Sequence, residues 1–179
     1  MKRSQKLAVS GLLTAFASVV LILSNFVPVG MYTFPAAAGL ILWVLSFAAG
    51  RQYALYAYAA VSVIGFLICS NKEAPLCFIL FLGYYPLLRP FLEKLRFRVL
   101  SYILKLLLFN AAAVGTYFLL LYVFSVPTED FRLFGISLPL VFLLLLNVVF
   151  LVYDVALKLF ERKYRETINK LVTNFFRRF

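Results

Sequence analysis

Long apolar runs alternate along the whole chain with short segments that are polar or contain proline and glycine. Each run has about 15 to 26 residues. At a rise of about 1.5 Å per residue, some 20 residues cross the roughly 30 Å hydrocarbon core of a bilayer. The pattern predicts an all-α membrane protein with six transmembrane helices, at about residues 7–27, 35–49, 53–69, 75–92, 99–124 and 136–160.

The last segment, residues 161–179, has a different pattern, because apolar residues fill one helix face and basic residues the other. The apolar positions are Tyr164, Ile168, Leu171, Val172, Phe175, Phe176 and Phe179, and the basic ones are Lys163, Arg165, Lys170, Arg177 and Arg178. Such a helix lies in the interface and binds anionic lipids. A groove on a soluble partner is the alternative. We therefore expect a transmembrane domain, 1–160, followed by a basic amphipathic cytoplasmic helix, 161–179.

Positive charge is unevenly divided between the two ends of the predicted spans. Of 18 Lys and Arg residues, 16 fall at one end, Arg89 among them, and only Lys72 and Arg132 fall at the other. This asymmetry predicts that the N- and C-termini are both cytoplasmic in a cell membrane. Because the charges mark span ends instead of alternating with aromatic stacking platforms, we expect no nucleic-acid partner. The first apolar run, 7–27, exceeds the length of a signal peptide and is expected to be retained.

Uncharged polar side chains recur near the middle of the later spans. Asn110 and Asn147 each lie about eleven residues into a span, and Tyr84 and Tyr85 lie at a comparable depth, inside the helix-breaking segment Gly83–Pro86. Polar groups in hydrocarbon usually face the interior of a helix bundle. A hydrogen bond between helices is one interpretation, worth about 0.6 kcal/mol on average. The floor of a solute-binding pocket is the other.

The uncharged connector 27–34, VPVGMYTF, is broken by proline and glycine and carries Tyr32. It is expected to fold over the bundle as a lid. In the first span, small residues recur every three or four positions, and such a stripe lets another helix approach closely. That helix could belong to this bundle or to a partner. The stripe comprises Ala8, Gly11, Ala15 and Ser18.

Asp154 is the single acidic residue inside a predicted span. Lys158 lies one turn away and Lys105 lies at a comparable depth in the neighbouring span, so we expect an ion pair. Lys105 is also expected to extend toward the membrane surface. A proton-relay role is the alternative, although no second carboxylate falls within a predicted span.

Signatures of enzyme chemistry are missing from the sequence. There is no histidine, no nucleophile elbow and no phosphate-binding loop, so we expect no catalytic residues, no metal and no cofactor. The two cysteines, Cys69 and Cys77, fall near the predicted outer face. They are expected to act as small apolar residues, with a disulfide as the alternative.

The six-span region resembles the substrate-binding S components of energy-coupling factor (ECF) transporters. The resemblance covers about residues 6–160 and rests on KLAVSGLLTAFASVVLIL, VPVGMYTFP, FPAAAGLILWVLSFAAG and the cytoplasmic termini. It implies a small-molecule solute, a transmembrane coupling subunit and partner ATPases. In that family small residues of the first span face the coupling subunit, often as Ala-x-x-x-Ala, whereas Gly11 and Ala15 give Gly-x-x-x-Ala.

Under this resemblance the chain is a bacterial solute-capturing subunit rather than an enzyme. Tyr32 would belong to the lid, and Tyr84, Tyr85, Asn110 and Asn147 would form the pocket. Ala8, Gly11 and Ala15 would form the interface with the partner helix. The alternative is a membrane scaffold or assembly factor whose basic C-terminal helix binds a protein or anionic lipid; a membrane enzyme is a third interpretation.

Overall fold

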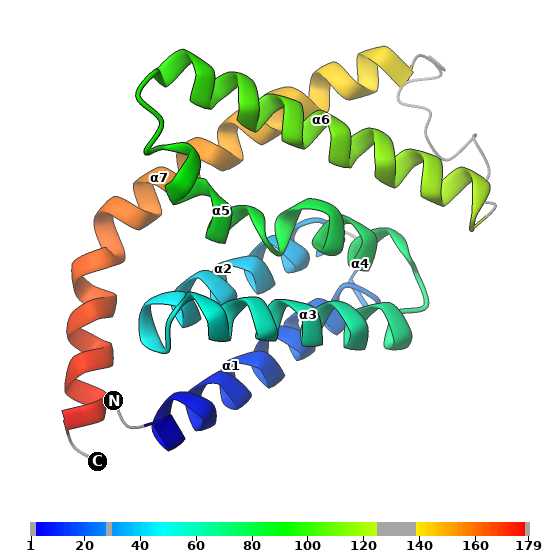
Figure 1. The fold of residues 1–179 in the computed structure, drawn as a ribbon. Coiled ribbons are helices and arrows are strands. Elements are labelled where there is room, and N and C mark those ends of the chain that lie inside the picture. The colour runs from blue at the N-terminus through cyan, green and yellow to red at the C-terminus, as the bar shows by residue number, and fades with distance from the viewer. Residues whose placement is uncertain (1–2, 28–29, 125–138, 178–179) are drawn as a thin grey trace.

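The computed structural model describes residues 3–27, 30–124 and 139–177, and these residues form helices joined by short turns (Figure 1). No strand occurs within these three ranges. The all-helical prediction is therefore confirmed for the described part of the chain. The helices are α1 (Arg3–Leu23), α2 (Thr33–Ala48), α3 (Arg51–Ile68), α4 (Glu73–Cys77), the π-helix η2 (Phe78–Leu82), α5 (Tyr85–Leu92), α6 (Arg98–Tyr122) and α7 (Pro139–Arg177).

Five helical stretches are long and apolar enough to cross a membrane: Arg3–Leu23, Arg51–Ile68, Glu73–Leu92, Val99–Tyr122 and Leu143–Lys163. They correspond to predicted spans 1, 3, 4, 5 and 6. The remaining predicted span is α2, which is apolar but only 16 residues long. Large apolar side chains are exposed along α1, α6 and α7, as hydrocarbon contact requires.

Small residues allow close packing among α1, α2 and α3. Ala17, Ala38, Ala54 and Ala57 are buried in their common core. A Cβ atom added at Gly65 of α3 would lie 2.4 Å from a methyl carbon of Leu21 in α1. The small residues of α2 and α3 therefore let these helices pack closely against α1.

The fourth predicted span is not one regular helix but is broken where the sequence indicated. The N–H of Gly83 donates to the carbonyl of Phe78 at 2.8 Å, which closes a π-turn in place of an α-turn. The carbonyl of Leu82 lacks an i+4 donor, because Pro86 has no N–H. Gly39 of α2 packs against this carbonyl, and a Cβ at Gly39 would lie 2.1 Å from its oxygen.

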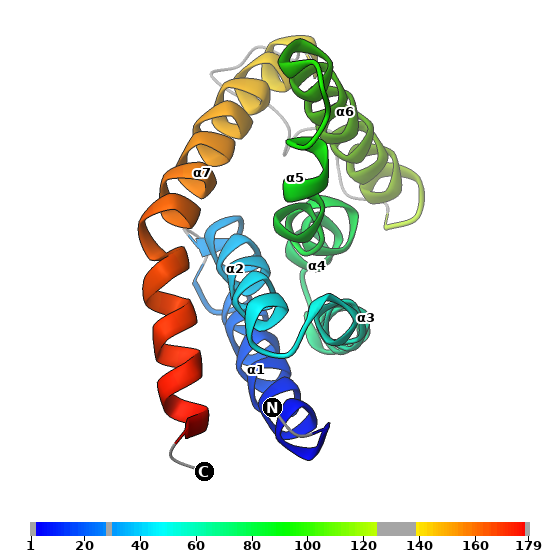
Figure 2. The same ribbon diagram turned by 60° about the vertical axis from the view of Figure 1, so that its left-hand side comes forward.

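α7 continues without interruption across the predicted boundary at residue 160. The segment there, residues 158–163, reads KLFERK and contains no glycine or proline, so nothing ends the helix. The separate C-terminal helix predicted from 161 is thus the continuation of α7. Figures 1 and 2 show that this red part turns away from the first part and runs toward the end of the molecule where α1 begins. The amphipathic character predicted for 161–179 depends on the side chains of residues 164–179, which lie outside the part of the chain that the structure describes.

Candidate functional site

A cluster of charged side chains is buried where α5, α6 and α7 meet. α5 provides a phenol and a guanidinium, and Glu93 directly after it provides a carboxylate. α6 provides an ammonium, and α7 provides two carboxylates about two turns apart. Arg89, Lys105 and Asp154 are only 2–3% exposed. We call this group the ion cluster: Tyr85, Arg89, Glu93, Lys105, Asp154 and Glu161.

Asp154 lies at the centre of the ion cluster and receives donors from two other helices. Nζ of Lys105 lies 2.9 Å from Oδ2, and Nε of Arg89 lies 3.0 Å from Oδ1. The hydroxyl of Tyr85, which is fully buried, also donates to Oδ1. The predicted ion pair of Asp154 with Lys105 is confirmed, whereas Lys158 is exposed.

Arg89 contacts a different carboxylate with each of its three guanidinium nitrogens. Beside the Nε contact to Asp154, one terminal nitrogen lies 2.6 Å from Glu93 and the other lies 2.8 Å from Glu161. Lys105 also reaches Glu93, at 3.3 Å. Arg89 therefore connects α5 to two turns of α7, those of Asp154 and Glu161. Glu93 contacts both cations of the cluster, Arg89 and Lys105.

The electrostatics of the ion cluster favour a structural joint between helices. Burying a charge is compensated only when partners and hydrogen bonds replace water, and here each buried charge has at least two partners. Two cations face three carboxylates, so the ionised cluster has a formal charge of −1.

In the described part of the chain, no group of three His, Cys, Asp or Glu side chains is placed to hold a metal ion.

Asn110 of α6 and Asn147 of α7 face each other, as their shared depth predicted. Each amide nitrogen donates to the oxygen of the other residue at 2.9 Å. The same nitrogens also donate at 2.8 Å to the carbonyls of Leu106 and Leu143, one turn earlier in each helix. Both N–H groups of each amide are thus engaged within the protein.

The other predicted pocket residues lie in different surroundings. Tyr85 belongs to the ion cluster, and the ring of Tyr84 packs edge-on against Tyr58, with 6.0 Å between centroids. Tyr32 precedes α2 and is 53% exposed. The structure therefore pairs the two asparagines but does not bring the five residues into one pocket. A recess beside Arg89 is lined instead by Leu40, Trp43, Pro86, Leu157 and Phe160.

The small-residue stripe of α1 is divided between two environments. Ser18 is buried against the bundle, but Ala8, Gly11 and Ala15 are exposed. A Cβ atom added at Gly11 would have no atom of another described element within 4 Å. Three of the four stripe positions are therefore exposed at the surface of the described bundle.

The two cysteines are free thiols, so the disulfide alternative is not observed. Cys69, at the end of α3, is fully buried. Burial disfavours the charged thiolate and raises the pKa of the Cys69 thiol above its ordinary value, despite opposing contributions from Ser24 and Lys72. This is consistent with the role of an inert, small apolar residue.

Sequence reasoning missed three members of the ion cluster. Arg89 was counted with the charges that mark the cytoplasmic end of its span, but it is buried. Lys105, whose ion pair with Asp154 was predicted, points into the cluster and not toward the surface. Glu93 and Glu161 supply the carboxylates that no predicted span contained. Helical spacing was the available signal, because Glu93 lies four residues after Arg89 and Glu161 lies seven after Asp154.

The fold defines a helical protein with several segments able to cross a membrane, three of which are joined by buried ion pairs. No protein-family model, no curated protein and no solved structure matches this chain.

Proposed function

We propose that this chain is a membrane-embedded, solute-capturing subunit that works with partner subunits, as in an ECF-like importer. The observation that carries the proposal is the exposed stripe of Ala8, Gly11 and Ala15 on α1. In membranes, small residues support helix association because they let two backbones approach closely. A transmembrane coupling subunit is the partner that the sequence resemblance implies, and ATPases would supply the energy.

The proposed topology has six crossings with both termini in the cytoplasm. It is supported by the charge asymmetry of the sequence. It is further supported by the cation–π contact of Arg51 with Phe91, 3.6 Å from the ring centroid, which brings the α2–α3 turn beside the end of α5. In this topology α2 crosses the membrane in addition to the five longer apolar segments, which makes six crossings. The last part of α7 lies along the cytoplasmic interface.

Solute capture in this proposal uses the asparagine pair. A neutral polar solute would exchange the two mutual amide bonds of Asn110 and Asn147 for bonds to itself, while the bonds to the preceding turns persist. Tyr84 packs against Phe81, which in turn packs against Phe109, the residue before Asn110. The exposed Tyr32 would close over the solute from the α1–α2 connector.

Affinity purification in a mild detergent, followed by mass spectrometry of proteins and small molecules, tests both parts of the proposal. We expect a membrane partner and a small solute with the unaltered chain. Gly11→Leu should lose the partner, whereas Phe16→Leu, at an exposed position on another face of the same helix, should keep it. Asn147→Leu should lose the solute alone. If Gly11→Leu keeps its partner, the α1 interface is refuted; unchanged solute content in Asn147→Leu refutes the pocket.

A scaffold or assembly factor is the second candidate, and the extension of α7 favours it. α7 has 39 residues, more than a single crossing needs. Under this hypothesis, truncation after residue 160 abolishes partner or anionic-lipid binding, while a solute is absent from every preparation. A solute that copurifies with the truncated chain would contradict it.

A further inference from the structure

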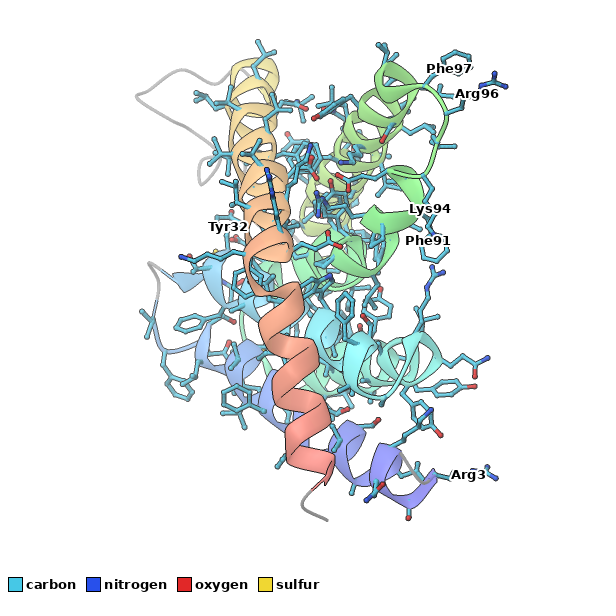
Figure 3. The ribbon with its side chains drawn as sticks, turned by 90° about the vertical axis from the view of Figure 1, so that its left-hand side faces the viewer. Arg3, Tyr32, Phe91, Lys94, Arg96 and Phe97 are labelled. Carbon is cyan, nitrogen blue, oxygen red and sulfur yellow. The ribbon has the colours of Figure 1, made fainter. Side chains whose placement is uncertain are left out.

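Two cations from different parts of the chain converge on one exposed aromatic ring. The guanidinium carbon of Arg51, the first residue of α3, lies 3.6 Å from the centroid of Phe91. The ammonium of Lys94, two residues beyond α5, lies 5.4 Å from the same centroid. Phe91 is 44% exposed, so this arrangement lies at the surface. Figure 3 shows Phe91 and Lys94 along one edge of the molecule.

The protein does not neutralise these two charges within its described part. Neither side chain makes an ion pair or a side-chain hydrogen bond there, in contrast to Arg89 and Lys105. Glu93, which precedes Lys94 in the sequence, is already engaged by those two buried cations. The two surface cations are at most about 9 Å apart, given their 3.6 and 5.4 Å distances to one centroid. Like charges at that separation repel, and an anion between them would remove the repulsion.

The chemistry of the surroundings identifies the anion. A guanidinium stacked on a ring keeps its N–H edge free, and that edge matches the oxygens of a phosphate. The residues that follow Lys94 in sequence include four exposed apolar side chains, as a contact with acyl chains requires: Leu95, Phe97, Val99 and Leu100. Aromatic and basic residues together are typical of the headgroup level of a bilayer. A phosphate with attached acyl chains fits both parts of this surface.

We infer that Arg51, Phe91 and Lys94 form a binding site for the headgroup of an anionic phospholipid. The phosphate lies between the guanidinium and the ammonium, and the acyl chains run along the apolar side chains that begin α6. This headgroup site is separate from the basic C-terminal part of α7 and does not depend on the proposed function. By occupying it, one lipid would hold the α2–α3 turn and the α5–α6 connector together.

Native mass spectrometry of the purified full chain titrated with phosphatidylglycerol tests the headgroup site. The double variant Arg51→Gln/Lys94→Gln should weaken binding about thirtyfold, since each of the two cations near an anionic surface contributes about 1 kcal/mol and about 1.4 kcal/mol is a factor of ten. The control Arg96→Gln/Lys158→Gln removes the same charge at two exposed positions and should change binding less than twofold. Phe91→Leu keeps both charges but removes the ring, and should give an intermediate loss.

Three results would overturn the inference. Equal losses in the two double variants would mean that lipid responds only to the overall charge. Equal binding of phosphatidylcholine would remove the role of the anionic headgroup. Displacement of phosphatidylglycerol by excess inorganic phosphate would assign the site to a free anion and not to a lipid.

Discussion

Replacing Arg89 with glutamine removes the one side chain that contacts all three carboxylates of the ion cluster. The formal charge of the cluster then changes from −1 to −2, with Lys105 as the remaining cation. Removing one partner from a buried ion pair typically destabilises a protein by about 3–5 kcal/mol. Because Arg89 is 2% exposed and makes three such contacts, we expect Arg89→Gln to fall in that range.

Glu93→Gln breaks the same Arg89–Glu93 contact but has the opposite effect on the charge. It brings the formal charge of the cluster to zero, and its side chain is 33% exposed, so we expect a loss of about 1 kcal/mol or less. Arg96→Gln, at an exposed position in the following connector, serves as the control and should stay within about 0.5 kcal/mol.

The free energy of unfolding can be measured in mixed micelles of increasing SDS content. The only tryptophan, Trp43, packs edge-on against Phe160 of α7 with 5.7 Å between ring centroids, so its fluorescence reports the contact of α2 with α7 near the cluster. Equal losses for Arg89→Gln and Glu93→Gln would show that the charge balance is irrelevant. If Arg89→Gln lowers the free energy of unfolding by less than about 1 kcal/mol, the ion cluster does not stabilise the packing of α5, α6 and α7 as proposed.

Three further predictions concern other contacts. Asn110→Ala and Asn147→Ala should be non-additive in the same SDS assay, with a coupling energy of about 0.6 kcal/mol; a coupling of zero would contradict the reciprocal amide bonds. Gly39→Leu should lower the thermal midpoint of unfolding, because its Cβ would meet the Leu82 carbonyl at 2.1 Å, and an unchanged midpoint would exclude that close approach. Cys69 should react with a maleimide more slowly than an exposed thiol, and faster as the pH rises, because burial raises its pKa; labelling of the folded protein as fast as in SDS would contradict this.

Periodic features of the fold could be predicted from the sequence, because each has a local cause. Apolar run length gave the spans, and proline with glycine gave the break before α5. The equal depth of Asn110 and Asn147 predicted their contact, since adjacent antiparallel helices bring equal depths together. Nothing in that pattern indicated whether each amide forms its hydrogen bonds with a solute or only with the other amide.

The ion cluster was harder to predict because it depends on how helices pack. Arg89 stands at the end of an apolar run, where exposure to the cytoplasm is the usual outcome. Its burial follows from contacts with Asp154 and Glu161, which lie 65 and 72 residues further along the chain. The boundary predicted at residue 160 had a different cause: a change in composition at 161 was interpreted as the start of a new helix, whereas α7 continues through it.

The reciprocal amide pair between α6 and α7 also restricts how these two helices can move. Axial sliding of one helix past the other by a turn, about 5.4 Å, would separate the amides and leave polar groups facing hydrocarbon. Rocking or twisting about the pair leaves both bonds intact. We therefore expect α6 and α7 to rotate about the contact of Asn110 with Asn147 but not to slide along each other. A series of engineered cysteine pairs along the two helices tests this, because cross-links should form only between residues in the register described here.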